Sequence, residues 1–575
     1  MAGRKAFYGI DLGTTHTVVV KATKEGGEWK YVKLKLVNMP ISELDDIKET
    51  ELLPSAVYFA KDGRIIVGEY AKEAIHFDPE RVYINAKIDL GGSLRKDQYN
   101  EHTPQEVSKE LLKVCFARIV EDGGSNASVR ISVPAAFSQD KRSDTENAAK
   151  QALFEMGYKE DLKLVRTTEE PFAALVNLVI NENQFINMVQ SDKNTIMLID
   201  IGGGTMDIII SDISQDKANN VLQARTPYEP AKHDEFAGAK FDYELMKKFM
   251  VDFLNHYELY EHEVPEQDLI ILEKRMLLIA EDAKKFLCNK DNTSRIYEFT
   301  CDFEGLRIDL SQKEPFKISI SKKQMDIALD GLLNSKEEYG TNQSIKRIIR
   351  KTLSDNGLYP KDIDCIYLTG GMANYDQISN TIKSVIQKPV IVAEEPLYCT
   401  ATGVALSLVI QTPEGTAEIS KVLQQKMSTI NEGEEAEQET VLGEDEKGDI
   451  KKSIEGVNID ISETKRMGMS YYIDVEDNMP VEIISKDESY PCLLKNSNVK
   501  LKTSSQSRMN LVLYEGHSVY DCGMRLLRKK TVEFREMVNI GTTIDISYKI
   551  DANKLITIYA SVDGEVPFEF NTEED

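Results

Sequence analysis

Two short turns in the sequence bring aspartate, glycine and threonine together in a spacing that could hold a phosphate group and a metal ion. The first runs Asp11-Leu12-Gly13-Thr14-Thr15, and the second runs Asp200-Ile201-Gly202-Gly203-Gly204-Thr205-Met206-Asp207. Glycine permits a close approach of backbone to ligand, and successive backbone N–H groups in a turn can bind an anion. The aspartates could hold a hydrated Mg²⁺ ion, since Mg²⁺ accepts few carboxylates and retains several waters.

A third glycine pair follows another apolar run, Ile366-Tyr367-Leu368-Thr369, and precedes a predicted helix. Gly370 and Gly371 would then lie close to the N-terminus of that helix, where backbone N–H groups favour a ligand. The sequence holds no G-x-x-x-x-G-K-[ST] motif, so the chain is not a P-loop protein.

The elements that must position these turns are predicted from apolar periodicity in the first 410 residues, where short apolar runs alternate with amphipathic stretches. This alternation is typical of an α/β domain. Helical patterns lie between the strands, at residues 141–156, 245–257 and 343–354. Because the Asp-x-Gly unit occurs twice, each time between two apolar runs, we expect two similar lobes, at about 1–190 and 191–410.

The rest of the chain divides into a linker and a second domain. Residues 411–460 contain an acidic run, 431–449, with nine acids, one lysine and no aromatic residue, which predicts a flexible linker. Residues 461–575 hold short runs of alternating apolar and polar residues with turn residues between them. That pattern predicts an all-β sandwich.

Composition restricts the classes of partner. The chain has 575 residues with 70 Lys and Arg against 96 Asp and Glu, a net charge of −26, which argues against nucleic acid or an anionic membrane as the main partner. Its seven cysteines form no C-x-x-C pair, so neither a disulfide framework nor a zinc site is expected. No apolar run approaches the roughly 20 residues that cross a bilayer, and no secretory signal is visible. We expect a cytoplasmic protein.

The three glycine motifs, in this order, resemble those of the actin-like ATPase superfamily, and further segments resemble its 70-kDa heat-shock (DnaK-type) chaperones. These segments are 86–87 (AK), 131–137 (ISVPAAF), 168–174 (TEEPFAA), 280–287 (AEDAKKFL), 470–491, 513–516 (LYEG) and 550–555 (IDANKL). The resemblance implies an α/β two-lobed actin-like ATPase with duplicated ribonuclease-H-like lobes, followed by an all-β peptide-binding sandwich. It also implies ATP or ADP with Mg²⁺ as the ligands.

The resemblance assigns roles to matching residues. Asp11, Asp200 and Glu170 would organise Mg²⁺, mainly through waters. Lys87 and Thr205 would hold the γ-phosphate and the attacking water, and Asp207 would position or deprotonate that water. The residues left to contact phosphates and adenosine are Gly13, Thr14, Thr15, Gly202, Gly203, Gly204, Glu281, Lys284, Lys285, Gly370 and Gly371. The alternative for each polar residue is an ordinary cap or surface charge.

In the sandwich, the resemblance places an apolar peptide cleft at Ile473, Val499, Met509 and Leu511. Extended peptides bind such clefts through backbone hydrogen bonds and apolar pockets. The alternative is that these four are plain core residues, because alternate apolar residues in a strand face a core. Pro134 and Arg142 match the family's interdomain relay, which implies that ATP is coupled to peptide release.

The chain departs from the family at several positions. Cys288, Met372 and Asn374 replace the usual Ser, Ser and Arg of the adenine pocket, and Leu397 stands where an Asp is usual. His16 replaces a Tyr beside the phosphates. The hydrophobic interdomain linker is altered, since residues 461–465 occupy its place and the nearest substitute is 457–460. About fifteen residues follow the last predicted strand, so we expect no helical lid and short-lived client binding.

These observations favour an ATP-dependent chaperone that binds unfolded or extended apolar segments, with slow Mg-ATP hydrolysis controlling its affinity. A J-domain co-chaperone and a nucleotide exchange factor are implied by the family. The main alternative is a nucleotide-sensing scaffold whose β domain docks one dedicated protein partner. An actin-like small-molecule kinase is a third interpretation, but it leaves the sandwich unexplained.

Overall fold

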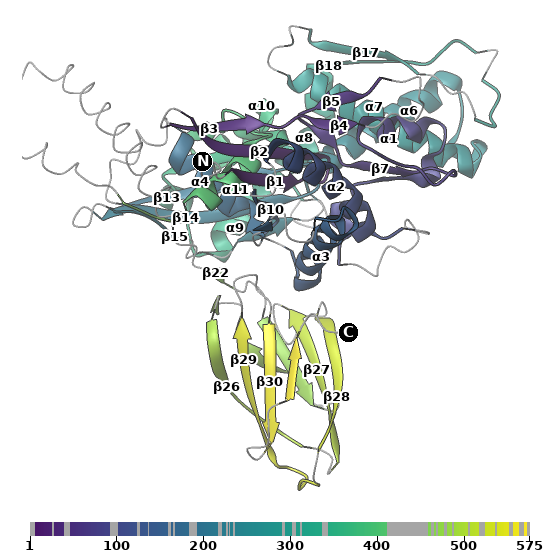
Figure 1. Ribbon diagram of the computed structural model, residues 1–575. Coiled ribbons are helices and arrows are strands. Elements are labelled where there is room, and N and C mark those ends of the chain that lie inside the picture. Colours follow the sequence, from purple (N-terminus) through teal and green to yellow (C-terminus); the bar gives the residue numbers. More distant parts are fainter. Residues whose placement is uncertain are drawn as a thin grey trace, which may run out of the picture. The chain divides into compact units, whose positions relative to one another are not determined.

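The computed structural model describes residues 6–571 with gaps (Figure 1). The gaps are 26–27, 39–45, 92–101, 124–126, 136, 159–162, 165–166, 183–192, 217–220, 226–227, 229, 234–235, 290–291, 293, 302–305, 311–312, 336–342, 411–457, 462–464, 467–469, 476–479, 486–487, 491, 504–506, 517–523, 535–536, 551–555 and 563–567. The acidic run predicted as a linker therefore lies outside the described residues.

The chain forms two compact units. The first comprises Met1–Phe137, Asp144–Ala224 and Pro230–Ile461, and the second comprises Ser138–Ser143, Arg225–Glu229 and Ser462–Asp575.

One mixed sheet of the first unit has the strand order β11-β10-β1-β2-β3, with β12 beside β10 and β6 beside β2. Its strands are β1 (Phe7–Leu12), β2 (His16–Glu25), β3 (Glu28–Lys33), β6 (Leu53–Pro54), β10 (Ser128–Val133), β11 (Lys163–Leu164) and β12 (Thr168–Glu169). The central strand β1 is parallel to β10 and antiparallel to β2. The turn between β1 and β2 carries Gly13, Thr14 and Thr15.

The second mixed sheet has the order β20-β19-β13-β14-β15-β21, with β16 beside β14. Its strands are β13 (Lys193–Ile201), β14 (Met206–Asp216), β15 (Val221–Arg225), β16 (Ala231–His233), β19 (Cys365–Thr369), β20 (Val390–Val392) and β21 (Asn458–Ile461). Its centre repeats the first sheet, because β13 is parallel to β19 and antiparallel to β14. The strand–turn–strand unit that the sequence predicts thus occurs twice.

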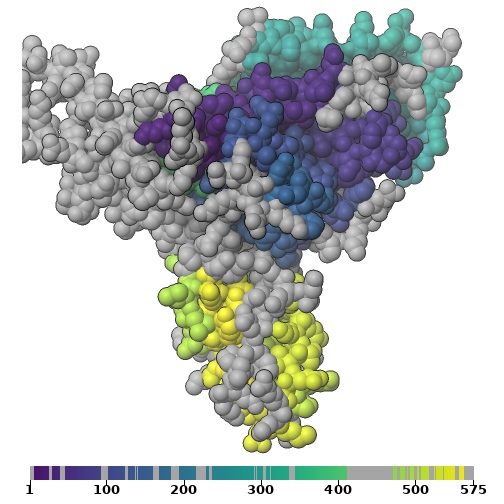
Figure 2. Space-filling model, viewed as in Figure 1, coloured from purple at the N-terminus to yellow at the C-terminus, as the bar shows by residue number. Residues whose placement is uncertain are grey.

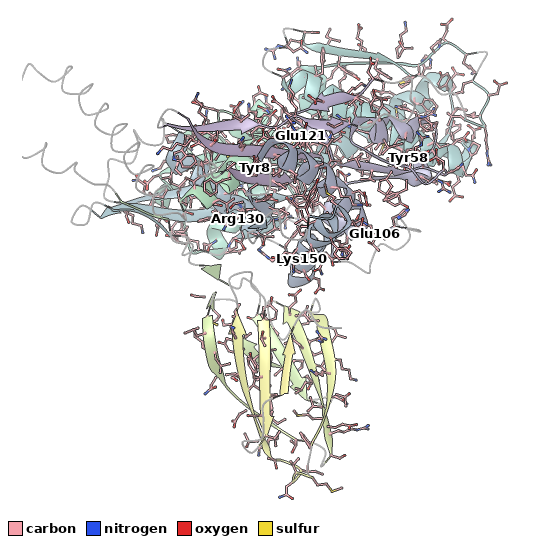
Figure 3. The ribbon with its side chains drawn as sticks, in the orientation of Figure 1. Tyr8, Tyr58, Glu106, Glu121, Arg130 and Lys150 are labelled. Carbon is pink, nitrogen blue, oxygen red and sulfur yellow. The ribbon has the colours of Figure 1, made fainter. Side chains whose placement is uncertain are left out.

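The helices of the first unit pack against its sheets and against one another. They are α1 (Glu69–Glu73), α2 (Pro104–Gly123), α3 (Gln139–Glu155), α4 (Glu170–Asn181), α6 (Gly238–Tyr257), α7 (Glu266–Cys288), α8 (Lys322–Asn334), α9 (Ile345–Asp355), α10 (Asp376–Ile386) and α11 (Cys399–Val409). Helices α4 and α11 pack closely, since a Cβ atom on Gly403 would lie 1.8 Å from the carbonyl oxygen of Ala173. Arg130 of β10, labelled in Figure 3, donates a hydrogen bond of 2.9 Å to Ser407 Oγ of α11. None of the helices described combines the length and the apolar character needed to span a membrane.

Smaller sheets complete the first unit. They are β4 (Leu36–Asn38) with β5 (Lys48–Thr50), β17 (Ile296–Thr300) with β18 (Lys317–Ser321), and the order β8 (Ile65–Val67), β7 (Ala56–Phe59), β9 (Val82–Ile84). Figure 2 shows the N-terminal segment, in purple, side by side with the region of α6 to α8, in teal.

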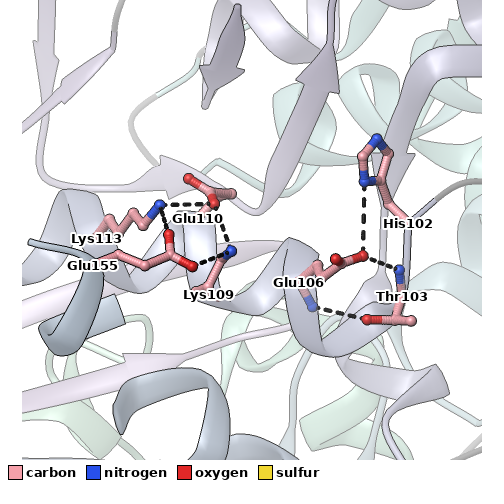
Figure 4. Close-up of polar contacts among 7 residues, drawn as sticks. All are labelled: His102, Thr103, Glu106, Lys109, Glu110, Lys113 and Glu155. Carbon is pink, nitrogen blue, oxygen red and sulfur yellow. Dashed lines mark hydrogen bonds and ion pairs between the residues drawn. The ribbon is translucent and has the colours of Figure 1, made fainter. Parts of the chain in front are cut away.

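Charged side chains join α2 to α3 (Figure 4). Glu155 of α3 accepts from Lys109 at 2.8 Å and also pairs with Lys113, and both lysines contact Glu110. A capping box begins α2, because Thr103 and Glu106 exchange hydrogen bonds of 2.8 and 3.2 Å. We interpret these contacts as structural, because they join the two helices and cap the start of α2.

The second unit contains two antiparallel four-stranded sheets that share one apolar core. One has the order β24 (Val481–Ile484), β23 (Ser470–Val475), β27 (Arg508–Gly516), β28 (Arg525–Glu533). The other has the order β26 (Cys492–Lys502), β29 (Thr543–Ile550), β30 (Ile556–Val562), β31 (Phe568–Asn571). Alternate residues of β30 are buried, as expected for a sheet with one face toward a core. Two further short strands of this unit, β22 (Lys465–Arg466) and β25 (Ser489–Tyr490), form an antiparallel pair.

Candidate functional site

A cavity of about 670 Å³ opens in the first unit. Both mixed sheets contribute to it, through the β1–β2 turn, the β13–β14 turn and the residues after β19. The residues that line it are Asp11, Gly13, Thr14, Thr15, His16, Val18, Leu52, Lys87, Glu170, Asp200, Gly202, Gly203, Thr205, Gly238, Asp242, Glu281, Lys284, Lys285, Cys288, Asn289, Gly370, Gly371, Met372, Asn374, Tyr375, Ala393, Glu394, Pro396, Leu397 and Thr400.

The two Asp-x-Gly turns lie directly against each other at this cavity. A Cβ atom on Gly203 would lie 1.8 Å from Thr15 Oγ1, and one on Gly204 would lie 2.6 Å from Thr14 Oγ1. Any side chain at these glycines would push the turns apart, so the glycines are required by the approach of two backbones. Gly370 adopts φ +84°, and a Cβ atom there would lie 2.4 Å from Asp200 Oδ1.

Three carboxylates meet one lysine at the buried end of the cavity. Lys87 Nζ lies 2.5 Å from Glu170 Oε1. Asp11 accepts a hydrogen bond of 2.7 Å from Ser132 Oγ, and Asp200 accepts one of 3.3 Å from Thr400 Oγ1. Glu170 is the first residue of α4, so the helix N-terminus faces this group.

The pKa values of these groups reflect burial and mutual repulsion. Burial, together with the negative charges of Glu170, Asp11 and Asp207, raises the pKa of Asp200 well above its usual value. Burial also raises the pKa of Glu170, although Lys87 opposes the shift. Burial disfavours the Lys87 ammonium, but Glu170 and Asp11 outweigh burial and raise the pKa of Lys87. A bound cation would relieve the repulsion among the carboxylates.

Thr205 and Asp207 sit at the start of β14. Thr205 is buried and lines the cavity, and its carbonyl oxygen accepts from the N–H of Gly202 at 3.0 Å, which closes the turn. Asp207 is paired with Asp200 in the register of β13 and β14 and is also buried. It is on the same face of the sheet as Asp200 but is not among the residues that line the cavity.

Helix α7 contributes a chain of charged side chains to the cavity wall. Lys284 Nζ lies 2.7 Å from Asp242 Oδ1 of α6 and donates to the Gly238 carbonyl at 3.0 Å. Glu281 pairs with Lys285 at 2.6 Å and with Lys72 of α1 at 2.5 Å. Although burial opposes it, the charges of Lys72 and Lys285 lower the pKa of Glu281 well below its usual value.

His16 of β2 completes this wall. Its Nε2 lies 3.3 Å from Lys285 Nζ. Burial and then the charge of Lys285 lower the pKa of His16 to about 3, so its ring is neutral and accepts from the lysine near pH 7.

The other end of the cavity is apolar. It is built around the 3-10 turn η7 (Gly371–Asn374) and includes Met372, Leu397 and Cys288. Burial raises the pKa of the Cys288 thiol to about 12, so this side chain is neutral. Carboxylates thus lie at one end of the cavity and apolar side chains at the other.

The structure brings together all but two of the residues that the sequence predicts for phosphate, metal and adenosine. Gly204 packs against Thr14, and Asp207 lies opposite Asp200, but neither residue lines the cavity. The two residues predicted for the interdomain relay do not line this cavity. Pro134 follows β10 directly, Arg142 lies in α3, and both are buried.

The four residues predicted to form a peptide cleft lie in the sandwich. Ile473, Met509 and Leu511 are fully buried and belong to the core that both sheets share. Val499 is a residue of β26, and its side chain lies outside the described residues. The structure therefore fits the core interpretation at three positions and leaves the cleft a prediction.

The sequence motifs assign no role in the site to three polar residues that the structure places there. Asp242, Ser132 and Thr400 hold Lys284, Asp11 and Asp200 respectively. Each is far from its partner in the sequence, by 42, 121 and 200 positions, so no local spacing marks it.

The donor set fits a hydrated Mg²⁺ ion better than a directly coordinated metal. In the part of the chain that the structure describes, no three His, Cys, Asp or Glu side chains are close enough to bind a metal ion together. Asp11, Glu170 and Asp200 nevertheless surround one region with oxygen atoms. Mg²⁺ prefers oxygen and keeps waters, so it could be held here through water and ligand oxygens.

Comparison with known proteins identifies the family. The chain is 27% identical to the chaperone protein DnaK of Thermotoga neapolitana and 26% identical to that of Thermosipho africanus, over 421 and 427 residues. These matches cover 71% and 73% of this chain but 60% and 61% of the relatives, so the chain spans less than two thirds of their length. The sequence model of the Hsp70 protein family matches residues 94–429, which is more than half of the chain. The chain therefore belongs to the Hsp70 family, as a divergent member.

Proposed function

We propose that the chain is an ATP-dependent chaperone that binds Mg-ATP in this cavity and hydrolyses it slowly. The observation that carries the proposal is the meeting of Asp11, Lys87, Glu170, Asp200 and Thr205 in one cavity beside three glycine turns. Hydrolysis of a phosphoanhydride mainly requires positioning and charge neutralisation, which such a group supplies. The DnaK relatives support the chaperone class.

The charges of the lining residues support a requirement for a divalent cation. Six acids line the cavity against three lysines, namely Asp11, Glu170, Asp200, Asp242, Glu281 and Glu394 against Lys87, Lys284 and Lys285. Each lysine already pairs with an acid. A polyphosphate would therefore be repelled unless a cation accompanied it. Mg²⁺, held by Asp11, Glu170 and Asp200 through waters, would neutralise the phosphate oxygens.

The chain's own residues divide the work of hydrolysis. Thr14, Thr15 and the N–H groups of the two glycine turns orient the phosphates. Lys87 holds the γ-phosphate. The Thr205 hydroxyl holds the water that attacks this phosphate. Asp207, which lies opposite Asp200 in the register of β13 and β14, orients that water or accepts its proton.

For the whole chain we propose residues 1–410 as a two-lobed ATPase, 411–460 as an acidic linker and 461–575 as the client-binding sandwich. Unfolded polypeptides would bind the sandwich near Ile473, Val499, Met509 and Leu511, and Pro134 and Arg142 would relay the nucleotide state. A J-domain co-chaperone and a nucleotide exchange factor would accompany the cycle, as the family suggests.

One observation favours the alternative, a nucleotide-sensing scaffold with one dedicated protein partner. Ile473, Met509 and Leu511 are 0% exposed, so none of the three offers surface to a client in this structure. A scaffold would use the outer surface of the sandwich instead. Binding to unrelated apolar peptides separates the two functions.

Phosphate release from ATP tests the proposed activity. We expect release with Mg²⁺ and none with excess EDTA. Thr205→Val removes the hydroxyl and should slow hydrolysis by about 100- to 1,000-fold with ATP affinity nearly unchanged. Thr205→Ser keeps the hydroxyl and should retain activity. Equal rates in the Val and Ser variants would contradict the role of Thr205, and absence of Mg²⁺-dependent release would contradict the activity.

A further inference from the structure

The apolar end of the cavity carries an inference about which nucleotides the site accepts, and it rests on the proposed nucleotide binding. Met372 is buried, and a Cβ atom on Gly371 would lie 3.2 Å from Leu397 Cδ2, so Leu397 lies against the floor of η7. Cys288 is neutral, and Tyr375 is buried beside it. Such contacts are non-directional and do not distinguish one flat ring from another.

Three backbone donors near this end are already used. The N–H groups of Ala373 and Tyr375 donate to the carbonyls of Gly370 and Met372, in and beside η7, at 3.0 Å. The N–H of Ala393 donates to the Leu368 carbonyl at 3.0 Å. These three backbone groups are therefore not directed at a ligand.

The cations of the wall are also engaged. Lys284 is held by Asp242 and the Gly238 carbonyl, and Lys285 by Glu281 and His16. An arginine or lysine free to stack on a base is thus missing among the described lining residues of the cavity, whose lysines, with Lys87, are all paired.

One carboxamide near the apolar end is adaptable. Asn374 donates to the Gly371 carbonyl at the long distance of 3.4 Å. A carboxamide presents a donor and an acceptor and can exchange them by rotation, so it can suit either an amino or a carbonyl group of a purine. Glu394 is exposed to solvent, where hydrogen bonding to water competes.

We propose that this site selects its nucleotide through the polyphosphate and the apolar faces of the base, and that it binds ATP and GTP with little preference. An apolar pocket discriminates poorly between rings of similar size, whereas a pocket of fixed hydrogen-bonding groups discriminates strongly. Met372 and Leu397 are apolar side chains at positions where hydrogen-bonding side chains could otherwise contact the base.

Calorimetric titration of the full chain with Mg²⁺ and ATP, GTP or inorganic triphosphate tests this inference. We expect ATP and GTP to bind within tenfold of each other, and triphosphate more weakly than both. A preference for ATP over GTP greater than tenfold would overturn the inference while leaving nucleotide binding intact. If none of the three probes binds, the proposed function itself fails, and the inference with it.

A pair of variants locates the effect. Leu397→Ala should weaken ATP and GTP by the same factor, about tenfold, because it removes apolar contact with either base. Its affinity for triphosphate should not change. Ile327→Ala, at a 68% exposed position of α8 outside the cavity, is the matched control and should change nothing. Unchanged nucleotide affinities in Leu397→Ala would contradict the contact.

Discussion

Asp200 is the residue at which stability and function oppose each other most clearly. It is buried among Glu170, Asp11 and Asp207, and its pKa is raised. A carboxyl group whose pKa is higher in the folded state than in the unfolded state lowers the free energy of unfolding as pH rises through that interval. At neutral pH the buried Asp200 carboxyl therefore lowers the free energy of unfolding of the ligand-free chain, and a bound cation would compensate for this loss.

We predict that Asp200→Asn stabilises the ligand-free chain at pH 7, by about 1–2 kcal/mol, because it replaces a buried carboxyl group that is unfavourable to ionise with a neutral side chain of the same shape. The gain should vanish below about pH 3, where the Asp200 carboxyl is neutral in both the folded and the unfolded state. Trp29, the single tryptophan, packs against the core of the first unit and reports its thermal unfolding.

The same variant should lose Mg²⁺-dependent ATP binding, which calorimetry would detect. A destabilised Asp200→Asn chain at pH 7, or one that binds Mg-ATP as tightly as the parent, would contradict this account of Asp200.

At the scale of single residues, the sequence predicts the groups that local motifs mark. Asp11, Asp200 and the glycines are visible because each turn carries its own spacing. Lys87 and Glu170 needed the family resemblance, since nothing in their neighbourhood requires a buried ion pair. Asp242 could not be predicted, because its partner lies on another helix.

At the scale of elements, the site depends on two turns that touch. Gly203→Ala would place a methyl carbon 1.8 Å from Thr15 Oγ1 and 2.9 Å from Thr15 Cβ, so the β13–β14 turn must move away from the β1–β2 turn. We predict at least a tenfold loss of Mg-ATP affinity, measured by calorimetry, with about 1–3 kcal/mol of lost stability.

Gly331→Ala provides the matched control for this prediction. Gly331 lies within α8, is exposed and has open space around its Cα atom. Alanine there should stabilise the helix by about 0.5–1 kcal/mol and leave Mg-ATP affinity unchanged. Unaltered ATP binding in Gly203→Ala would show that the turns do not need to touch.

Element boundaries were predicted less well than element types. The periodicity predicts a helix over 245–257, whereas α6 runs from Gly238 to Tyr257. Its first turn forms against the β13–β14 turn, where the N–H groups of Gly238 and Ala239 donate to the carbonyls of Gly202 and Gly203 at 3.0 and 2.7 Å. Such a start depends on tertiary contact, which periodicity does not contain.

At the scale of the whole molecule, the strand that precedes the second unit belongs to a sheet of the first. Asn458–Ile461, close to the segment that the sequence proposes as a substitute linker, forms β21 parallel to β15, with Ile459 opposite Leu222. Proline removes a backbone N–H donor and fixes φ, so it weakens such a strand. If β21 couples nucleotide to client, Ile459→Pro should reduce ATP-induced peptide release several-fold without abolishing ATP binding.

Ile459→Val, which favours a strand, is the control and should behave as the parent. Stopped-flow fluorescence of a labelled peptide would measure the release. Equal release rates for the Pro and Val variants would contradict a role of β21 in coupling ATP binding to peptide release.

The central claim is that Mg-ATP controls binding of apolar peptide segments by the sandwich. Fluorescence anisotropy of unrelated labelled apolar heptapeptides, first with ADP and then with Mg-ATP, tests it most directly. The account predicts that several peptides bind with ADP and leave when Mg-ATP is added. If no peptide binds while the nucleotide does, the claim is contradicted, and a scaffold with one dedicated partner becomes the better description.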